Sequence, residues 1–599
     1  MDQLENSLAR LLFDQVEKNS NKVLYMEKVD GNYKSFTRSE IHSTVLKLAK
    51  SFIQCGLQPK DKVAILSTNC VKWAITDFGC LSAGLIDVPI YPTLLSNTIE
   101  FILKNSETKF VFVQNSIQLK KVLEIDLSQT SVEKIVVMND DTSGFEHEYL
   151  TTFTAFLDLG VSISDKYVHA RLDATNNDDV ATLIYTSGTT GMPKGVMLSH
   201  KNILSNVHAA ATVVPKSEDH VFLSFLPLSH IFERMFGHYM AMFFGATVAY
   251  AESIETVAQN MGEIRPTVMA SVPRLYEKIY AKVLDSVEQG SPLKQKIFFW
   301  ALKVGKEVVN KYTSVGKKPS GLLAFKLGIA NKLVFNKLKD RVGGRLEYFV
   351  SGGGALMAEI AEFFTSAGLL ILEGYGLTET SPVITVNRPN HFKFGFVGQA
   401  IPGVEIKIQD DGEILTRGPH VMKGYFKNEE ATNEVMTEDG WFKTGDIGYL
   451  DNDGFLKITD RKKNIIVTSG GKNIAPLPIE AALVRSKYIE QSLMIGDKRK
   501  FCAAILTPSE EALEQFAKAE GINYSSLTEL VSHEKVKKLI DSEVEKVNDG
   551  LARYESIKKY ILLDRVFTIE SGEMTPKLSI KKKVVLKNLE KEINELYAE

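Results

Sequence analysis

LIYTSGTTGMPKGVMLSH, residues 183–200, is the stretch of sequence that decides both the fold and the chemistry. An apolar run on each side predicts two strands, and the loop between them holds three glycines, four hydroxyl side chains and Lys194. Glycines let the backbone approach a phosphate, hydroxyls and amides donate to its oxygens, and a lysine neutralises its charge. The loop therefore predicts a polyphosphate cradle, with a chance glycine- and hydroxyl-rich loop as the weaker alternative. It is not a Walker loop, because Gly195 rather than Ser or Thr follows the lysine.

Short apolar runs alternate with helical patterns on both sides of this loop. Examples are KVAILS (62–67), KFVFVQ (109–114), LEYFVSGGG (346–354) and LLILEGYG (369–376). This alternation is typical of parallel α/β structure and predicts two or more α/β lobes. From residue 398 to 449 short strand-like runs and turn dipeptides predict a small β-rich unit. We expect a domain boundary at about residue 460.

Composition narrows the class of partner. The 599 residues include 71 basic and 74 acidic side chains, so the net charge of -3 does not favour a nucleic acid. The four cysteines show no zinc or disulfide spacing. No secretory signal and no apolar run of about 18–20 residues is found. We therefore expect a cytoplasmic protein, either soluble or peripheral at the inner membrane face.

Residues 291–345 are unusually rich in lysine, with Glu307 and Asp340 as the only acids. Apolar residues interleave with the lysines at roughly helical spacing. A basic amphipathic surface of this kind binds anionic membranes. The alternative is a pair of helices packed on the domain with their lysines in solvent.

The phosphate loop resembles the signature loop of the adenylate-forming superfamily, which includes acyl-CoA synthetases, firefly-type luciferases and peptide-synthetase adenylation domains. Three further motifs follow in the family's order: GYGLTETSP (374–382), the stretch from GWFKTGD to GGKNIAP (440–476) and GEMTPKLSIKKK (572–583). The resemblance thus runs over nearly the whole chain. LPLSHIFER (226–234) is most similar to the long-chain fatty acid CoA ligase branch.

The resemblance implies an α/β fold with two parts. A large N-terminal adenylation domain, residues 1–460, would hold two α/β lobes and a small β-barrel. A hinge at residues 461–463 would lead to a small mobile α+β domain, residues 464–599, which switches between adenylation and thioester formation. The cofactors and substrates implied are ATP, Mg²⁺, coenzyme A and a medium- to long-chain fatty acid.

The resemblance also assigns roles to individual residues. Glu379 would place Mg²⁺, together with Thr190, and Thr378 would contact the α-phosphate. Lys194 would act with the loop on the β- and γ-phosphates. The remaining phosphate contacts would be Thr186, Ser187, Gly188, Thr189 and Thr190.

For the nucleoside, Tyr375 offers an aromatic face to adenine. Asp446 and Arg461 match the family positions that hold the ribose hydroxyls, and the Asp446 carboxylate would accept both of them. Lys463 would mark the hinge. The other residues assigned to the nucleotide or to the pantetheine arm of coenzyme A are Gly353, Gly354, Ala355, Glu373, Gly374, Gly376, Gly470 and Gly471. Plain alternatives are a core role for Tyr375 and a solvated side chain for Lys463.

His230 matches a position in the family that gates the acyl pocket or orients the carboxylate, and a core histidine is its alternative. The apolar residues 231–246 would line the acyl tunnel or would be plain core.

The sequence departs from the family at one catalytic position. The family's C-terminal motif carries a lysine that donates to the carboxylate and α-phosphate, and this chain has Ser579 there. We predict that Lys577 replaces it, with Lys581 as the alternative. The remaining alternative is a weakened adenylation step. The sequence therefore predicts an AMP-forming ligase that joins a medium- to long-chain fatty acid to coenzyme A. A fatty-acyl-AMP ligase without transfer to coenzyme A, and a non-catalytic nucleotide- or acyl-binding homologue, are the competing functions.

Overall fold

The two apolar runs around the phosphate loop are neighbouring antiparallel strands, β8 and β9, in which Thr186 lies opposite Lys194. They belong to an eight-stranded sheet whose central strands are parallel. Strands buried on both faces read as continuous apolar runs, as KVAIL does here. In sheet order the strands are β19 (Gly424–Tyr425), β9 (Lys194–Ser199), β8 (Val180–Thr186), β4 (Ile86–Ile90), β3 (Lys62–Leu66), β5 (Thr108–Val113), β6 (Lys134–Val137) and β7 (Leu150–Thr152).

A second sheet has nine strands and again a parallel centre. Its order is β16 (Gln399–Ala400), β15 (Val383–Val386), β14 (Leu370–Gly376), β13 (Tyr348–Ser351), β12 (Val268–Ser271), β10 (Val221–Ser224), β11 (Thr247–Tyr250), β1 (Val23–Val29) and β2 (Asn32–Thr37). These two sheets are the two predicted α/β lobes. The predicted β-rich stretch forms a four-stranded sheet in the order β17 (Glu405–Ile408), β18 (Glu413–Arg417), β20 (Phe442–Leu450) and β21 (Leu456–Arg461).

Helices connect the parallel strands. α2 begins with a capping box, in which Thr37 and Glu40 satisfy each other's free backbone N–H groups. The helices around the first sheet are α1 (Arg10–Lys18), α2 (Arg38–Gln54), α3 (Val71–Ser82), α4 (Ser96–Ser106), α5 (Ser116–Leu123), α6 (Phe153–Asp158), α7 (Asp165–Ala174) and α8 (His200–Ala211). Those that follow are α9 (Ile231–Glu233), the π-helix η2 (Arg234–Met240), α10 (Ala241–Phe244), α11 (Val257–Ile264), α16 (Ala358–Ser366) and α17 (Glu429–Val435).

One hydrophobic cluster contains side chains from both large sheets, and a buried ion network lies among them. The guanidinium of Arg234 donates to the carboxylates of Asp77 and Asp87 and to the hydroxyl of Thr182. All four side chains are buried. Burying a charge is costly unless it is paired and hydrogen-bonded, and here the pairing is dense. The network therefore fixes α3, β4 and β8 against η2.

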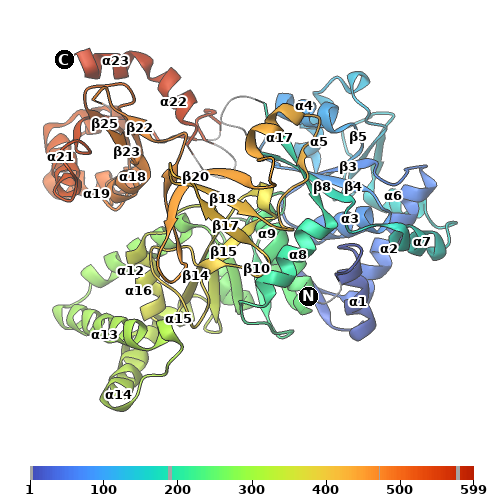
Figure 1. Ribbon diagram of the computed structural model, residues 1–599, viewed down its shortest axis with the longest axis horizontal. Helices are drawn as coiled ribbons and strands as arrows, with labels where there is room; N and C mark the ends of the chain where they lie inside the picture. Colours follow the sequence, from blue (N-terminus) through green and yellow to red (C-terminus); the bar gives the residue numbers. More distant parts are fainter. Residues whose placement is uncertain (1–3, 187–191, 471, 569, 575–579, 599) are drawn as a thin grey trace. The chain divides into compact units, whose positions relative to one another are not determined.

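The computed structural model describes residues 4–186, 192–470, 472–568, 570–574 and 580–598 (Figure 1). The chain divides into two units. Unit 1 is Met1–Lys407, Leu415–Lys443 and Asp451–Leu456, and unit 2 is Ile408–Ile414, Thr444–Leu450 and Lys457–Glu599. The predicted α/β class, with a large N-terminal and a small C-terminal part, is confirmed. The exact boundary and the hinge at 461–463 stay predictions.

In unit 2 the three-stranded sheet β24–β25–β26 carries a separate hydrophobic cluster on each face. Alternate residues of β25 point to opposite faces, so Ala504 and Leu506 join one cluster, and Ala503 and Ile505 the other. The strands are β24 (Ile489–Ile495), β25 (Cys502–Pro508) and β26 (Ile557–Leu562); the helices are α18 (Pro476–Leu483), α19 (Glu510–Glu520), α20 (Leu527–Ser532), α21 (Glu534–Asn548), α22 (Lys582–Asn588) and α23 (Glu590–Ala598).

The lysine-rich segment is helical, as its spacing predicts. Its elements are α13 (Pro292–Lys311), α14 (Gly321–Ala330), the π-helix η4 (Asn331–Phe335) and α15 (Asn336–Arg341), preceded by α12 (Pro273–Glu288). α13 packs against α14 and α16. Figure 1 shows α14 at the outer edge of unit 1, away from the sheets. Among the described residues, we find no helix with the length and apolar character needed to cross a bilayer.

Candidate active site

Lys194, the lysine of the phosphate loop, starts β9 and is half-buried. Its ammonium lies 5.0 Å from the centre of the Tyr425 ring. Tyr425 reaches this place because β19 pairs antiparallel with β9 at the edge of the sheet. The backbone N–H of Phe426 also donates to the carbonyl of Gly195, at 2.7 Å. The predicted phosphate ligands Ser187, Gly188, Thr189 and Thr190 lie outside the described residues.

Glu379 meets the same tyrosine. It lies in the short 3₁₀-helix η5 (Thr378–Thr380) that follows β14, and its Oε1 accepts a hydrogen bond of 2.9 Å from the Tyr425 hydroxyl. Burial, together with the neighbouring Glu379 carboxylate, raises the pKa of Tyr425 above its ordinary value, so the phenol stays protonated and donates. The structure thus brings together the predicted phosphate lysine and the predicted magnesium ligand.

Tyr425 itself was missed by the sequence analysis. It lies in a strand of only two residues, more than two hundred positions after the phosphate loop. Without a partner strand the sequence GYF has no pattern that indicates a role. Its position next to a glycine in a turn-rich region was the only local signal.

The predicted adenine-binding residues lie at the carboxyl ends of two adjacent parallel strands. Gly353, Gly354 and Ala355 follow β13 and are exposed, and Tyr375 is half-buried near the end of β14. Ser351 of β13 is in register with Glu373 of β14, so both loops leave the sheet at the same edge. In open α/β sheets this edge is where ligands bind.

Two residues of this edge are constrained by packing. A Cβ on Gly376 would lie 1.7 Å from the carbonyl oxygen of Pro382, so only glycine fits. Glu373 is buried, and that burial raises the pKa of its carboxyl to about 8. The Glu373 carboxyl is therefore protonated at neutral pH and can donate a hydrogen bond.

In unit 2, Asp446 of β20 and Arg461 at the end of β21 lie 3.2 Å apart, Nε to Oδ1. Asp446 is buried, whereas Arg461 is exposed. Lys463 and Gly470 are exposed as well, and Gly471 lies outside the described residues. The preceding Lys462 is held by Asp411 and Glu413, at 2.6 and 2.7 Å.

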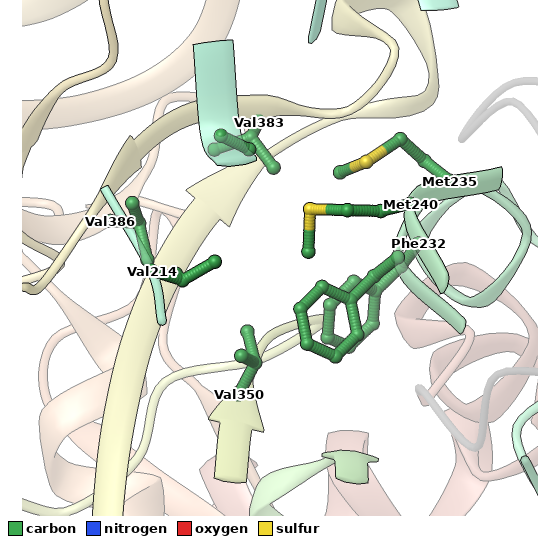
Figure 2. A pocket seen from close by; sticks show the side chains of 9 residues that line it. Val214, Phe232, Met235, Met240, Val350, Val383 and Val386 are labelled. Atoms are coloured by element: carbon green, nitrogen blue, oxygen red, sulfur yellow. The ribbon is translucent and has the colours of Figure 1, made fainter. Parts of the chain in front are cut away.

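His230 is half-buried and caps α9, because its Nδ1 accepts a hydrogen bond of 3.1 Å from the backbone N–H of Phe232. The next residues lead into an apolar cavity, shown in Figure 2. Its volume is about 20 Å³, which is about one water. Four of its nine lining residues fall within the stretch 231–246. The lining is Ala210, Val214, Phe232, Met235, Phe236, Met240, Val350, Val383 and Val386.

The C-terminal lysine candidates divide by position. Lys577 and Ser579 lie outside the described residues. Lys581 caps α22, and its backbone N–H donates to the carbonyl of Glu573 at 2.7 Å. Lys582 is half-buried, and burial lowers the pKa of its ammonium although Glu480 and Asp460 oppose the shift. Lys582 therefore lies partly buried in unit 2, with the acidic Glu480 and Asp460 in its surroundings.

The carboxylates of the described residues offer few donors for a magnesium ion. Among the described residues, no three His, Cys, Asp or Glu side chains gather as a metal site. Magnesium nevertheless often uses one or two protein carboxylates together with substrate phosphates. The single carboxylate of Glu379 fits that pattern. It accepts a hydrogen bond from Tyr425, and the Tyr425 ring lies near the Lys194 ammonium.

Comparison with known proteins gives full-length matches. Residues 12–426 match the family described as AMP-binding enzyme, and residues 463–599 match the AMP-binding enzyme C-terminal domain. The long-chain-fatty-acid–CoA ligase FadD15 of Mycobacterium bovis is 35% identical over 99% of this chain and 97% of its own length. The long-chain-fatty-acid–CoA ligase ACSBG2 of Xenopus laevis is 32% identical over 99% of this chain and 84% of its own.

Solved structures share the fold. The adenylation domain of a carboxylate reductase from Mycobacterium chelonae has a TM-score of 0.77 at 21% identity, covering 100% of this chain and 92% of that one. The anthranilate CoA ligase AuaEII, in complex with anthranoyl-AMP, has a TM-score of 0.73 at 18% identity, with 99% of each chain covered.

Proposed function

The chain belongs to the AMP-binding enzyme family, and from this premise we propose that it is a long-chain-fatty-acid–CoA ligase that forms AMP. In the first step a carboxylate oxygen attacks the α-phosphorus of ATP, which forms the acyl-adenylate and releases pyrophosphate. In the second step the sulfur of coenzyme A bonds to the acyl carbon, and AMP leaves with the electron pair. The observation that carries the proposal is the meeting of Lys194 and Glu379 at Tyr425.

The first step gathers several negative charges, and most of the catalysis is charge stabilisation and positioning. We propose that the Lys194 ammonium neutralises the β- and γ-phosphates, with Thr186 and the loop residues Ser187, Gly188, Thr189 and Thr190. Thr378 would donate to the α-phosphate. The Tyr425 hydroxyl holds one oxygen of Glu379 and leaves the other available to a cation.

Mg²⁺ would be held by Glu379 with Thr190, and when bound it supplies charge neutralisation at the phosphate oxygens. The residues that would contact the nucleoside are proposed from the same resemblance to the family. Tyr375 would stack on adenine beside Gly353, Gly354, Ala355, Gly374 and Gly376. A protonated Glu373 would donate to a ring nitrogen.

The Asp446 carboxylate would accept hydrogen bonds from the ribose hydroxyls. Arg461 would keep that carboxylate charged and oriented. Lys463 would be the hinge position between the two half-reactions. Gly470 and Gly471 would let the pantetheine arm of coenzyme A pass close to the backbone. Lys577 remains our candidate for the lysine absent at Ser579, with Lys581 next.

The acyl chain would enter the apolar cavity of Figure 2, with His230 at its approach. Because the cavity holds only about one water, Phe232, Met235 and Met240 must change rotamer to admit it. A cytoplasmic enzyme that touches the inner membrane face through residues 291–345 completes the proposal.

The direct test is AMP release from ATP and Mg²⁺ that depends on coenzyme A and on fatty acids of graded length. We expect turnover on medium or long acids, loss of turnover in Glu379→Ala, and selective loss of adenylation in Lys577→Ala. AMP formation without coenzyme A transfer would support an acyl-AMP ligase instead. ATP binding without any AMP release would support a binding protein.

A further inference from the structure

Helix α14 exposes an apolar stripe that no described part of the chain covers. Leu322, Phe325 and Ile329 are 68%, 67% and 37% exposed, and Leu333 in η4 is 45% exposed. Their spacing of three and four residues places them on one face of the helix. Single exposed apolar residues are common, but a continuous stripe marks an interaction site.

Another face of the same helix already holds it in place. Leu323, Leu327, Ala330 and Val334 pack with the hydrophobic cluster that α13 and α16 share. The exposed stripe is therefore not needed to attach α14 to unit 1. It is surplus apolar surface on a helix that is already fixed.

Exposed lysines flank this stripe. Lys317 and Lys318 precede α14, Lys326 and Lys332 lie within α14 and η4, and Lys337 follows. Acids are scarce nearby: Glu307 is paired with Lys311 at 2.7 Å, and Asp340 is exposed in α15. Lysines of this kind extend their ammonium groups toward lipid headgroups while apolar neighbours enter the acyl boundary.

From these observations we propose that the exposed face of α14 and η4 is the surface by which the protein docks on an anionic lipid bilayer. A second copy of the chain fits this face less well, because two lysine-flanked stripes would repel each other. A helix lying in the plane of the headgroups would bury the four apolar residues and keep the lysines at the phosphates. The inference rests on the proposed peripheral location, and its test needs neither ATP nor coenzyme A.

The experiment is flotation of the full-length protein with vesicles, either of phosphatidylcholine alone or of phosphatidylcholine and phosphatidylglycerol in equal parts. We expect partition into the anionic vesicles to exceed that into the neutral ones by about tenfold or more, and to fall in high salt. Leu322→Gln/Phe325→Gln/Ile329→Gln should lower anionic partition by about tenfold or more. Lys317→Gln/Lys318→Gln/Lys326→Gln should remove the preference for anionic vesicles.

Matched controls are available in unit 1. Leu95, Ile117 and Val161 are exposed apolar residues elsewhere, so Leu95→Gln/Ile117→Gln/Val161→Gln should bind as the wild type does. Lys47→Gln/Lys120→Gln/Lys166→Gln removes the same charge from other exposed sites and should keep the preference for anionic vesicles.

A second measurement does not depend on loss of binding. The tryptophan added in Phe325→Trp should be quenched by brominated lipids in anionic vesicles. The tryptophan added in Leu95→Trp should not be quenched. Equal binding by the stripe variant and the wild type would overturn the proposal. So would a wild-type dimer, seen by sedimentation, that the stripe variant dissociates without any vesicle binding. If AMP is released but vesicles are not bound, the docking proposal is wrong and the ligase proposal stands. If vesicles are bound but no AMP is released, the docking proposal stands and the ligase proposal is wrong.

Discussion

The hydroxyl of Tyr425 donates a hydrogen bond of 2.9 Å to the carboxylate of Glu379. The same ring lies 5.0 Å from the ammonium of Lys194. The protonated phenol of Tyr425 thus contacts both a cation and an anion. We propose that a bound polyphosphate and its metal ion use these two charges.

Tyr425→Phe tests this arrangement. Removing a hydrogen bond to a charged group costs about 1.5–3 kcal/mol, so we expect AMP release to slow by about ten- to a hundredfold and the Mg²⁺ requirement to rise. The measurement is the rate of AMP release against Mg²⁺ concentration. Tyr33→Phe is the control, because the Tyr33 hydroxyl donates to the Tyr250 carbonyl at 3.2 Å, in β2. An unchanged Mg²⁺ dependence in Tyr425→Phe would contradict the role given to this residue.

Gly376→Ala tests the packing at the sheet edge where β13 and β14 end, at which we propose that the nucleotide binds. Because the added Cβ would lie 1.7 Å from the Pro382 carbonyl oxygen, we expect a loss of about 1–3 kcal/mol of stability together with weaker ATP binding. Gly262→Ala in α11 is the control, since nothing lies within 4 Å of its Cβ, and alanine there should stabilise by about 0.5–1 kcal/mol. Thermal unfolding followed by tryptophan fluorescence reports on unit 1, which holds Trp73, Trp300 and Trp441. Equal melting temperatures for both variants would refute the steric argument.

Arg234→Met tests the buried ion network. The substitution leaves the Asp77 and Asp87 carboxylates without their cation, and breaking a buried pair costs about 3–5 kcal/mol. Arg417→Gln breaks the exposed pair with Glu405, at 2.7 Å, and should leave the free energy of unfolding nearly unchanged, because solvent screens surface ion pairs. Urea unfolding measured by tryptophan fluorescence gives both values. A small loss in Arg234→Met would mean that the core repacks around neutral carboxyls.

We predict that the stability of unit 2 depends on pH through the carboxyl group of Glu573. Its hydrogen-bonded pair with Arg565 lowers the pKa of Glu573 from 4.5 to about 2. A depressed carboxyl pKa stabilises the fold above about pH 4.5 and loses that contribution as the pH falls toward 2. The hydrogen-exchange protection factors of the β25 amides, which are corrected for the intrinsic exchange rate at each pH, should therefore fall over this window in the wild type. Glu573→Gln should show less change across the window, and an identical pH profile would contradict the assignment.

Much of the site was predictable because its residues lie in local motifs. The strands on either side of residues 187–191 and the adjacent strands β13 and β14 follow from apolar runs that read in sequence order. The roles of Asp446 and Arg461 came from the family resemblance, and their 3.2 Å pairing is visible only in the structure. Tyr425 was not predictable, because a strand of two residues gains its role only through pairing with distant β9. The lysine spacing predicted the helices of residues 291–345. The sequence did not predict which apolar side chains of α14 are exposed to solvent, because that depends on how the helix packs against α13 and the hydrophobic cluster shared with α16.

The π-helix η2 carries two kinds of side chain in one short element. Arg234, His238 and Tyr239 contact the buried Asp77, while Met235, Phe236 and Met240 line the apolar cavity. The first set anchors the backbone, and the second forms a wall of adaptable side chains on that anchored frame. Substitutions in the wall can therefore change the shape of the cavity without removing any of the contacts to Asp77, although a large-to-small change there still costs core packing energy. If the acyl chain enters this cavity, as we propose, the descendants of one ancestral enzyme would diverge in acyl preference through a few changes within this one short element.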